Sequence, residues 1–438
     1  MPKDRKRQPF ARLTWDRKPQ PTPEAADLQT WSELYPPTAR YPSETQGRLI
    51  LGDNLPVMLA LLPKYEGKID LIYADPPFLT GKAYQARIGH GEDSRDPGRW
   101  KTVQSYQDTW RDGGEYLDML YPRLELMWRL LAPHGSLYLH LDWHASAYAR
   151  ILLDDIFGPD RLLNEIVWVY HGPSPIRSAY NRKHDTILVY TKSKDYTFNV
   201  DDVRVPYSPS TVKTFASSER AGFGKKPNLE RGKVPEDWWY FPVVARMHSE
   251  RTGYPTQKPE ALMERIILAS SNPGNLVADF FCGSGTTPSV ATRLDRQWIA
   301  CDPEPTAMQT CYRRMVSTEG VKPFRLEGSE SSALSESLAP EISYELESDK
   351  LFIQLVDVFH RENGNKIERD HIVLWEIDPQ YDGQIFRSQY QQLRPWRDDS
   401  IGQMIQVPLE GKKSACLAVR VMDVQGNTGI TKLDIRLD

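Results

Sequence analysis

Apolar and polar positions follow two rhythms along the chain that together predict an α/β fold. Short apolar runs bounded by turn residues predict buried strands at 49–51, 68–74, 135–141, 163–170, 185–191, 276–281 and 297–301. Apolar residues at helical spacing predict helices at 55–62, 114–131, 145–157, 259–271, 286–294 and 305–318. The first of these helices is expected to stop near Pro63. Because strands alternate with helices, the pattern indicates a mostly parallel sheet with helices on both faces.

Other stretches depart from this rhythm. The N-terminal stretch is rich in proline and charge and predicts an irregular arm. A polar, basic segment punctuated by proline and glycine interrupts the α/β pattern, and a serine-rich linker precedes short alternating stretches that predict a small β domain. The expected organisation is an arm, one half-domain, an insert, the other half-domain, a linker and a β-rich domain: 1–46, 47–170, 171–255, 256–328, 329–340 and 341–438.

The distribution of charge is more informative than the net charge of -4. The insert at 171–255 holds 14 Lys and Arg against 9 Asp and Glu, and the first 19 residues hold 7 against 2. The tail at 330–438 instead holds 12 Lys and Arg against 19 Asp and Glu. Basic segments suit a phosphate backbone, and an acidic tail does not.

The spacing of the cysteines and the hydropathy of the chain limit the cellular compartments that fit this sequence. Cys282, Cys301, Cys311 and Cys416 show no CxxC spacing, so neither a zinc site nor a disulfide framework is expected, and no metal is predicted. A reducing cytoplasm fits this usage. The chain shows no apolar run of about 18 residues, so no membrane span is expected.

A glycine-rich turn follows a predicted strand and opens a predicted helix. This segment, DFFCGSGTT, spans residues 279–287. Glycines there let the backbone approach a cofactor closely, and the helix N-terminus favours its negative groups. The next strand ends in Asp302, and an acid at that point can bind both ribose hydroxyls. The combination predicts a cofactor site, although its spacing also fits a dinucleotide and a lone glycine-rich turn is often only a tight turn.

A second motif, Asp75-Pro76-Pro77-Phe78, stands at the end of another buried strand. Two prolines fix the backbone and hold the preceding carbonyls rigidly as acceptors. Asp75 adds a carboxylate acceptor and Phe78 an aromatic face. This set matches an exocyclic amino group on a stacked base. The alternative is a rigid turn with a capping aspartate.

Taken in order, LGDNL, LIYADPPF, YPTQKPEALMERII and DFFCGSGTT resemble the β-group of DNA amino-methyltransferases. In that group the catalytic motif precedes the cofactor motif, and the resemblance covers roughly residues 47–320. It implies a Rossmann-like, S-adenosylmethionine-dependent methyltransferase fold with an inserted DNA-recognition region and a small β-rich C-terminal domain.

The resemblance also implies roles for single residues. Asp302 would bind the ribose, Asp53 would lie near the adenine ring of the cofactor, and Thr256 and Lys258 would meet its carboxylate. The target amine would lie against the catalytic motif, Asp75, Pro76, Pro77 and Phe78. The methionine portion would lie against Asp279, Phe280, Phe281, Cys282, Gly283, Ser284, Gly285, Thr286 and Thr287. On general grounds, Asp53 also fits a capping residue, and Lys258 a surface lysine.

The implied reaction is direct transfer of the sulfonium methyl group to an amine. Acceptors at Asp75 and the Pro76 carbonyl would localise the nitrogen lone pair, and the base must leave the duplex because its amine is otherwise paired. No Pro-Cys pair occurs, which argues against cytosine-C5 chemistry. In the resembled group an Asp at the first motif position goes more often with adenine-N6, and a Ser with cytosine-N4. Adenine-N6 is therefore the expected product, with cytosine-N4 as the alternative.

Partner surfaces are less sharply indicated. Double-stranded DNA is the expected substrate, with candidate contacts in the insert at Arg177, Arg182, Lys183, Lys225, Lys226 and Arg231. The aromatic run at 238–241 is expected to be core packing rather than a contact surface. The acidic tail is expected to dock a restriction or defence partner or to form a homodimer. A different class of function, a site-recognition subunit that methylates only with a partner, also remains open, whereas a nicotinamide-dependent oxidoreductase leaves DPPF and YPTQKP unexplained.

Overall fold

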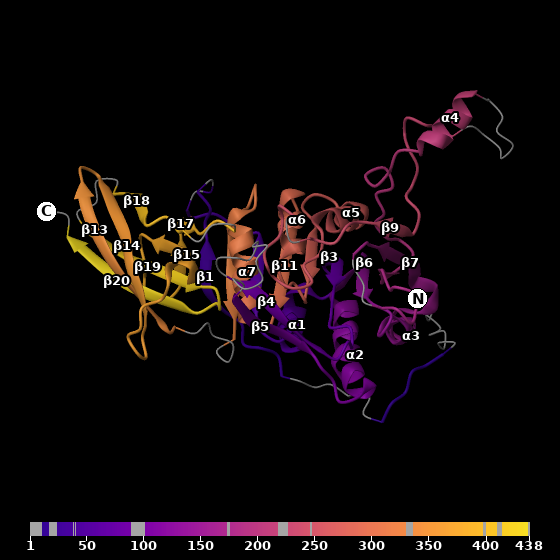
Figure 1. The fold of residues 1–438 in the computed structure, drawn as a ribbon, viewed down its shortest axis with the longest axis horizontal. Coiled ribbons are helices and arrows are strands. Elements are labelled where there is room, and N and C mark those ends of the chain that lie inside the picture. The colour runs from indigo at the N-terminus through magenta and orange to yellow at the C-terminus, as the bar shows by residue number, and fades with distance from the viewer. Residues whose placement is uncertain are drawn as a thin grey trace.

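A computed structural model of the chain places most of the predicted elements in one large mixed sheet (Figure 1). The residues it describes are 11–16, 24–37, 39, 41–88, 101–172, 176–217, 227–245, 248–329, 336–396, 400–409 and 414–436. The centre of the sheet is parallel, in the order β12 (Phe324–Gly328), β2 (Gly47–Leu51), β11 (Gln297–Asp302), β10 (Leu276–Asp279), β3 (Ile69–Ala74) and β6 (Leu131–Leu141).

Antiparallel strands extend this sheet at both edges. Beyond β6 lie β8 (His184–Thr191), β7 (Leu162–Val169) and β9 (Trp238–Tyr240), the last of which pairs parallel with β7. Beyond β12 lie β1 (Gln29–Leu34) and β16 (Phe386–Ser388). The predicted mostly parallel sheet is confirmed, and its edges are mixed.

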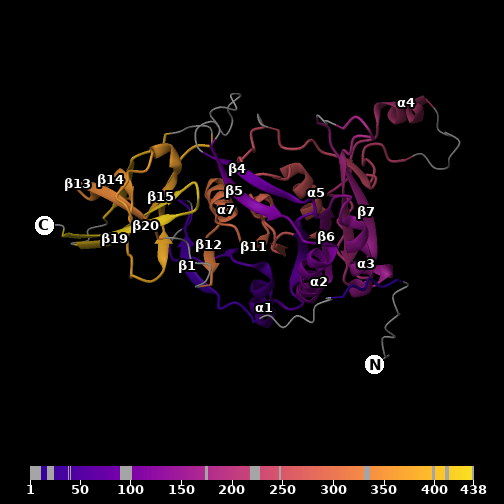
Figure 2. The same ribbon diagram turned by 60° about the horizontal axis from the view of Figure 1, so that its bottom comes forward.

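Helices cover both faces of the sheet, as Figure 2 shows. One face packs against α1 (Asn54–Tyr65), α2 (Gly113–Leu130) and α3 (Ser146–Phe157), and the other against α5 (Glu260–Ser270), α6 (Thr286–Arg293) and α7 (Pro305–Ser317). Neighbouring strand residues serve opposite cores: Leu49 faces α7 and Ile50 faces α1. Burial on both faces explains why the central strands are continuous apolar runs. The predicted Rossmann-like α/β architecture is confirmed.

Two expectations about boundaries are wrong, and one is confirmed. The arm at 1–46 is not irregular throughout, because β1 lies within it and buries Ser32 and Leu34 at the sheet edge. Helix α1 ends at Tyr65, two residues beyond Pro63, in agreement with the expected stop near that proline. The linker is shorter than 329–340, because β13 (Leu338–Glu347) begins at Leu338.

The C-terminal region is β-rich, as predicted. One sheet holds β13, β14 (Lys350–His360) and β18 (Met404–Pro408), and another holds β17 (Tyr390–Leu393), β15 (Ile372–Asp378), β19 (Ser414–Asp423) and β20 (Thr428–Arg436). Trp375 is fully buried between these sheets and donates a hydrogen bond to the Gly402 carbonyl. This region also completes the main sheet through β16, so it is not a separate body of structure.

The aromatic run at 238–241 divides between core and surface. Trp239 is buried and Phe241 packs against the same core, whereas Trp238 and Tyr240 are 58% and 50% exposed. Alternation follows from the strand conformation of β9, in which successive side chains point to opposite faces. The expectation of core packing is therefore confirmed for Trp239 and Phe241 and wrong for Trp238 and Tyr240.

A buried ion pair ties the C-terminal region to the α/β domain. Arg420 of β19 contacts Glu376 of β15 at 2.6 Å, and both side chains are buried. The same arginine donates to Ser32 of β1, and Tyr312 of α7 donates to Glu376. Each polar atom in this cluster thus depends on a partner from another element. No helix among the described residues is long and apolar enough to cross a membrane.

We expect Arg420→Met to lower the free energy of unfolding by about 3–5 kcal/mol, because it leaves Glu376 charged and buried. Adding Glu376→Leu in the double variant should recover much of the loss. Arg129→Met, which breaks the exposed pair with Glu66, is the control and should leave the denaturant midpoint unchanged. Equal midpoints for the Arg420 and Arg129 variants would contradict this interpretation.

Candidate active site

Four neighbouring strands of the parallel sheet each have an aspartate at their carboxyl end or within two residues of it. Along the order β2, β11, β10 and β3, the acids are Asp53, Asp302, Asp279 and Asp75. The carboxyl ends of parallel strands meet at one edge, which is where open α/β sheets bind ligands. The two motifs, about 200 residues apart in the sequence, therefore meet because β3 and β10 are hydrogen-bonded neighbours.

A cavity of about 930 Å³ lies at this edge. Its volume is in the range of small-molecule and cofactor sites. Most of the predicted site residues line it: Asp53, Asp75, Pro76, Pro77, Phe78, Thr256, Lys258, Asp279, Phe281, Cys282, Gly283, Ser284, Thr286, Thr287 and Asp302.

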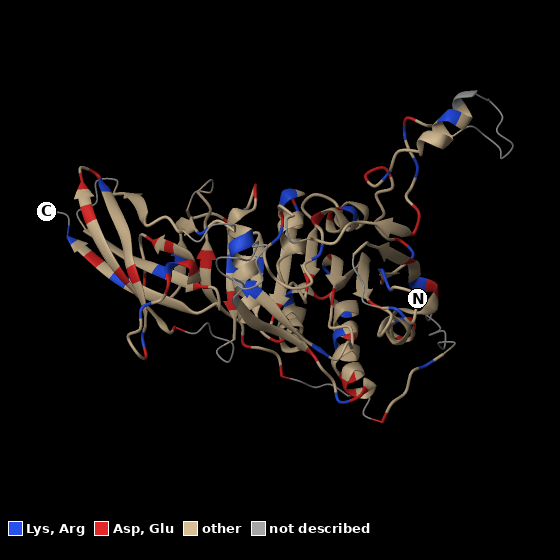
Figure 3. Ribbon diagram, viewed as in Figure 1, with Lys and Arg blue, Asp and Glu red and all other residues tan. Residues whose placement is uncertain are grey.

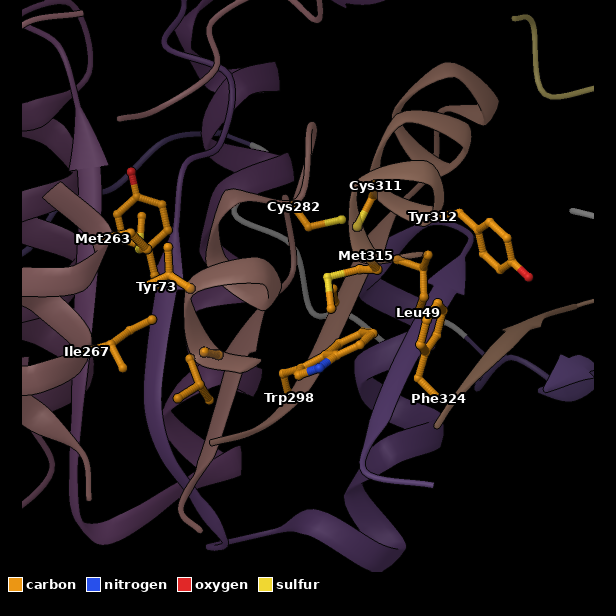
Figure 4. Close-up of a cluster of buried hydrophobic side chains, with 14 of the residues drawn as sticks. Leu49, Tyr73, Met263, Ile267, Cys282, Trp298, Cys311, Tyr312, Met315 and Phe324 are labelled. Atoms are coloured by element: carbon orange, nitrogen blue, oxygen red, sulfur yellow. The ribbon is translucent and has the colours of Figure 1, made fainter. Parts of the chain in front are cut away.

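Phe280 and Gly285 belong to the motif but do not line the cavity. The Phe280 side chain is buried in the core beneath α1 and α2. Gly285 has a φ of 75°, and a Cβ at this position would lie 2.5 Å from the Cys311 sulfur. Figure 4 shows Cys282 and Cys311 together in the core on the opposite face of the sheet, which includes residues of α5, α6 and α7. Gly285 therefore allows α6 to pack closely against α7, because a side chain at this position would collide with Cys311. Cys282 belongs to the turn and lines the cavity.

Asp279 and Asp302, the last residues of β10 and β11, are both buried. Asp279 accepts hydrogen bonds from the Phe281 amide and the Thr287 hydroxyl, and Asp302 accepts from the Gly283 and Glu304 amides. Burial raises the pKa of Asp279 to about 7 and that of Asp302 to about 6, despite these bonds. Each acid has been removed from water but is placed to accept hydrogen bonds or to face a cation in the cavity.

The Asp75 carboxylate has one occupied and one unoccupied oxygen. Oδ2 forms an ion pair with the ammonium of Lys258, which also contacts the Thr256 carbonyl. Oδ1 is buried and has no hydrogen-bond partner among the described residues. A buried acceptor with no donor costs free energy, so Oδ1 is suited to a donor supplied by a substrate.

The YPTQKP segment is held against the glycine-rich turn. The Thr286 hydroxyl donates to the Lys258 carbonyl at 3.2 Å, and Arg314 of α7 bonds both Thr286 and Glu260. Thr256 has a φ of 56°, which is rare for a β-branched residue. Such backbone strain gathers at ligand sites, and here it turns the Thr256 segment toward the cavity.

Asp53 caps a helix, as expected on general grounds, and its place in the cavity leaves the expected cofactor contact as a prediction. Its carboxylate caps α1 at the Leu55 amide and pairs with Arg123 of α2 at 2.6 Å, and it also lines the cavity. Arg123 was not predicted as a site residue, since helical spacing alone places it on an ordinary charged helix face.

A β hairpin that the sequence patterns did not predict covers the cavity. It consists of β4 (Lys82–Ile88) and β5 (Lys101–Asp108), which lie side by side in Figure 2. The rings of Tyr84 and Tyr106 stack with their centroids 4.7 Å apart. Its last residue, Asp108, is buried and accepts hydrogen bonds from the amides of Phe78, Leu79 and Thr80. Asp108 therefore fixes the loop that follows the DPPF prolines.

Another polar group that sequence reasoning missed is His140 of β6. Its ring is fully buried and lies between Asp75 and Asp185, the latter at the start of β8. A signal was present in the sequence, because His140 is a polar residue within an otherwise apolar run that ends at the same sheet edge as Asp75.

The candidate DNA contacts have different surroundings. Arg182 lines the cavity and lies over the Trp143 ring at 4.3 Å. Arg177 is exposed, Lys183 is half-buried, and Arg231 forms an exposed ion pair with Asp201. Lys225 and Lys226 lie outside the described residues. Of these candidates, Arg182 is the one at the mouth of the cavity.

Comparison with known proteins agrees with this geometry. The family profile described as DNA methylase matches residues 69–313. The type II methyltransferase M.HpaI of Haemophilus parainfluenzae is 34% identical over 239 residues, which cover 54% of this chain and 65% of that protein. The type II methyltransferase M1.MboII of Moraxella bovis is 35% identical, covering 55% of this chain and 87% of that protein.

Two further similarities were found. The DNA adenine methyltransferase YhdJ of Escherichia coli is 31% identical over 251 residues, covering 56% of this chain and 76% of that protein. The crystal structure of the M1.HpyAVI-SAM complex is 21% identical, with a TM-score of 0.40, and covers 61% of this chain and 98% of that chain. Because the profile match spans more than half of the sequence and includes both motifs around the cavity, the chain belongs to the DNA methylase family.

Proposed function

We propose that this chain transfers the methyl group of S-adenosylmethionine to N6 of an adenine that has been turned out of double-stranded DNA. The observation that carries the proposal is the meeting of two kinds of group in one cavity. Asp279 and Asp302 supply buried acceptors on the cofactor side, and Asp75 supplies a buried, unoccupied acceptor on the amine side.

The residues present fit S-adenosylmethionine. Asp302 can accept from ribose hydroxyls, and Asp279 can face the cationic ammonium of the methionine portion. Bound there, the cofactor would supply a methyl group activated by its sulfonium charge. Phe281 and the Gly283 backbone would lie along it, because both line the same part of the cavity.

The chain's own contribution to the chemistry is orientation of the amine. Asp75 Oδ1 and the Pro76 carbonyl would accept the two amine hydrogens, and Phe78 would stack on the base. Both prolines hold this arrangement before the base arrives, so little reorganisation is required. Lys258 pairs with the other oxygen of Asp75 and so leaves Oδ1 for the amine.

Adenine is the preferred base for two reasons. Asp75 stands at the motif position that goes with adenine-N6 in the resembled group, and one relative, YhdJ, is named as an adenine methyltransferase. Cytosine-N4 is the second candidate, since the two amines have the same hydrogen-bonding capacity.

We infer that the insert and the C-terminal region contact different partners. In Figure 1 the insert carries α4 (Pro209–Ser217) away from the body of the protein. Arg182 and Trp143 line the cavity. We infer that this side meets DNA. Acidic residues such as Glu341, Glu345 and Glu347 line the exposed part of β13 at the far end (Figure 3). That end would repel phosphates, which favours a protein partner or a second copy there.

The purified chain should convert adenine to N6-methyladenine in duplex DNA in the presence of S-adenosylmethionine, as measured by mass spectrometry of digested nucleosides. Asp75→Asn should slow single-turnover transfer at least about a hundredfold, because an amide replaces the anionic acceptor. Cofactor affinity, measured by calorimetry, should change little.

Asp295→Asn, which alters an exposed pair with Lys322, is the matched control and should transfer normally. Detection of N4-methylcytosine instead would make cytosine the target base and would contradict the choice of adenine. Cofactor binding without any methylated base would instead favour a recognition subunit that requires a partner.

Asp108→Asn should reduce methyl transfer through loss of order in the Phe78 loop. All the groups that face this carboxylate are donors, including the Thr80 hydroxyl and the Trp110 indole N–H. An amide would turn its own NH₂ toward them, and the left-handed backbone of Leu79, at φ 66°, would lose its restraint. We expect a loss of about 1–3 kcal/mol in stability. The KM for DNA should rise, as seen in initial-rate kinetics.

Asp382→Asn provides the control for this loop, because Asp382 accepts the Gln384 and Ile385 amides in a loop remote from the cavity. Its KM for DNA should equal that of the parent chain. A normal KM for the Asp108 variant would show that its hydrogen bonds do not shape the base site.

Cofactor affinity should fall as the pH is lowered from 8 to 5. Burial raises the pKa of Asp302 to about 6 and that of Asp279 to about 7, so both become protonated over this range. If the cofactor binds the ionised acids, Kd should increase at least about tenfold at pH 5. Calorimetric titration would measure it. Asp302→Asn should bind more weakly at pH 8 and show a smaller change with pH, and a constant Kd in the parent chain would refute both assignments.

A further inference from the structure

His140 occupies the centre of a buried polar cluster that the direct transfer step does not use. Its Nδ1 lies 2.8 Å from the Tyr73 hydroxyl and 3.4 Å from Asp75 Oδ1, and its Nε2 lies 3.3 Å from Asp185 Oδ2. The ring itself is fully buried. An imidazole between two carboxylates is the arrangement that passes protons in many enzymes.

Methylation of an amine creates a proton that must leave the site. The nitrogen gains a methyl group and a positive charge, and it becomes neutral only when one N–H bond breaks. Asp75 Oδ1 is the acceptor nearest to that hydrogen in the proposed arrangement. A proton that stayed on Asp75 would leave the buried ammonium of Lys258 without its counter-ion, which is unfavourable.

We propose that His140 takes this proton from Asp75 and passes it, through Asp185, to solvent. This inference rests on the proposed amine methylation. His140 is then a proton-relay residue that acts through Asp75 rather than by touching the base.

The step balances as follows. Before transfer, His140 is neutral, with Nε2–H donating to Asp185 and Nδ1 accepting from the Tyr73 hydroxyl. The amine N–H bond breaks as an Asp75 O–H bond forms. The Tyr73 hydroxyl hydrogen then turns away from Nδ1, and the Asp75 O–H bond breaks as the proton binds the freed lone pair of that nitrogen. The proton on Nε2 then moves to Asp185 and on to water. No oxidant or reductant is needed, and the products are a neutral secondary amine and a neutral thioether.

Charge in the cavity supports this order of events. With His140 neutral, Asp75, Lys258 and Asp185 together carry one negative charge, which offsets the sulfonium of the cofactor. After transfer the thioether is neutral, and a protonated His140 makes the cluster neutral as well. The sum over these groups is zero before the methyl group moves and zero again while His140 holds the proton, so methyl transfer leaves no new uncompensated charge among them in a region of low dielectric.

The groups packed around His140 limit where its proton can go. Tyr73 of β3 remains a phenol, because burial first and then the charges of Asp75, Asp279 and Asp185 raise its pKa well above the usual value. Trp168 of β7 and Phe78 pack against the imidazole at 5.3 and 5.5 Å and exclude water.

Asp185 forms the outer end of the route. It lines the cavity and also accepts from the Tyr170 hydroxyl at 3.1 Å. Burial alone would raise the pKa of Asp185, but His140, Lys258 and Tyr170 together lower it. Asp185 is therefore an anion at rest, with one side toward His140 and the other toward the opening.

The test measures single-turnover methyl transfer with saturating cofactor and duplex DNA. His140→Asn keeps a polar amide but cannot carry a proton, and Asp185→Asn keeps the shape of the outer group without its charge. We expect each to slow the chemical step by about 10²–10⁴-fold, with binding of cofactor and DNA unchanged. His134→Asn is the matched control, because His134 pairs with Asp70 at 2.6 Å on the same strand but outside the cavity. It should transfer at the parent rate.

Chemical rescue separates proton transfer from packing. His140→Gly leaves space for an added imidazole, and 4-methylimidazole and 4-bromoimidazole have similar size but very different basicity. The relay predicts that the methyl compound restores the rate much more than the bromo compound, and that the difference follows the fraction of free base as pH varies. Equal rescue by both, or a normal rate in His140→Asn, would overturn the proposal. Absence of any transfer by the parent chain would instead overturn the proposed function.

Discussion

The parallel alignment of β2, β11, β10 and β3 is the constraint on which the site depends. Each strand places its last residues at one edge, so two acids from the first part of the sequence and two from a distant later part meet in one cavity. The order of the motifs along the chain has no effect on this outcome, since only the order of strands in the sheet decides which side chains meet. A catalytic motif that precedes the cofactor motif therefore builds the same kind of site as the reverse order.

Acids at that edge of the sheet are buried, and their burial changes their pKa values. Asp279 and Asp302 have raised pKa values because the helices on both faces of the sheet exclude water from them. Asp75 differs from these two acids because it forms an ion pair with Lys258. The site thus contains two buried acids that accept hydrogen bonds from amides and a hydroxyl, and one acid that is paired with a lysine. That difference corresponds to the difference between holding a cationic cofactor and holding an amine.

Sequence patterns predicted what is local and missed what is long-range. The central strands, the helices and both motifs are visible because burial on two faces and helical spacing leave strong periodic signals. Asp108 gives no such signal, since its role comes from amides 28–30 residues earlier that only the hairpin brings near. The hairpin itself was missed because its strands, such as KAYQARI, mix polar and apolar residues without a clear period. Strand β1 was hidden for the same reason, as its side chains are only partly buried at the sheet edge.

The C-terminal region shows why a composition change is weak support for a separate unit. Its acidic character indicated a distinct domain, and its sheets do form their own core around Trp375. Yet β16 pairs with β1, and Arg420 is neutralised by Glu376 only where Tyr312 and Ser32 complete the hydrogen bonds. Those two residues belong to the α/β domain and its N-terminal edge strand. An arginine buried in this way is tolerable only when both regions are folded together, so the acidic end is held at a fixed distance from the cavity and from any DNA bound there.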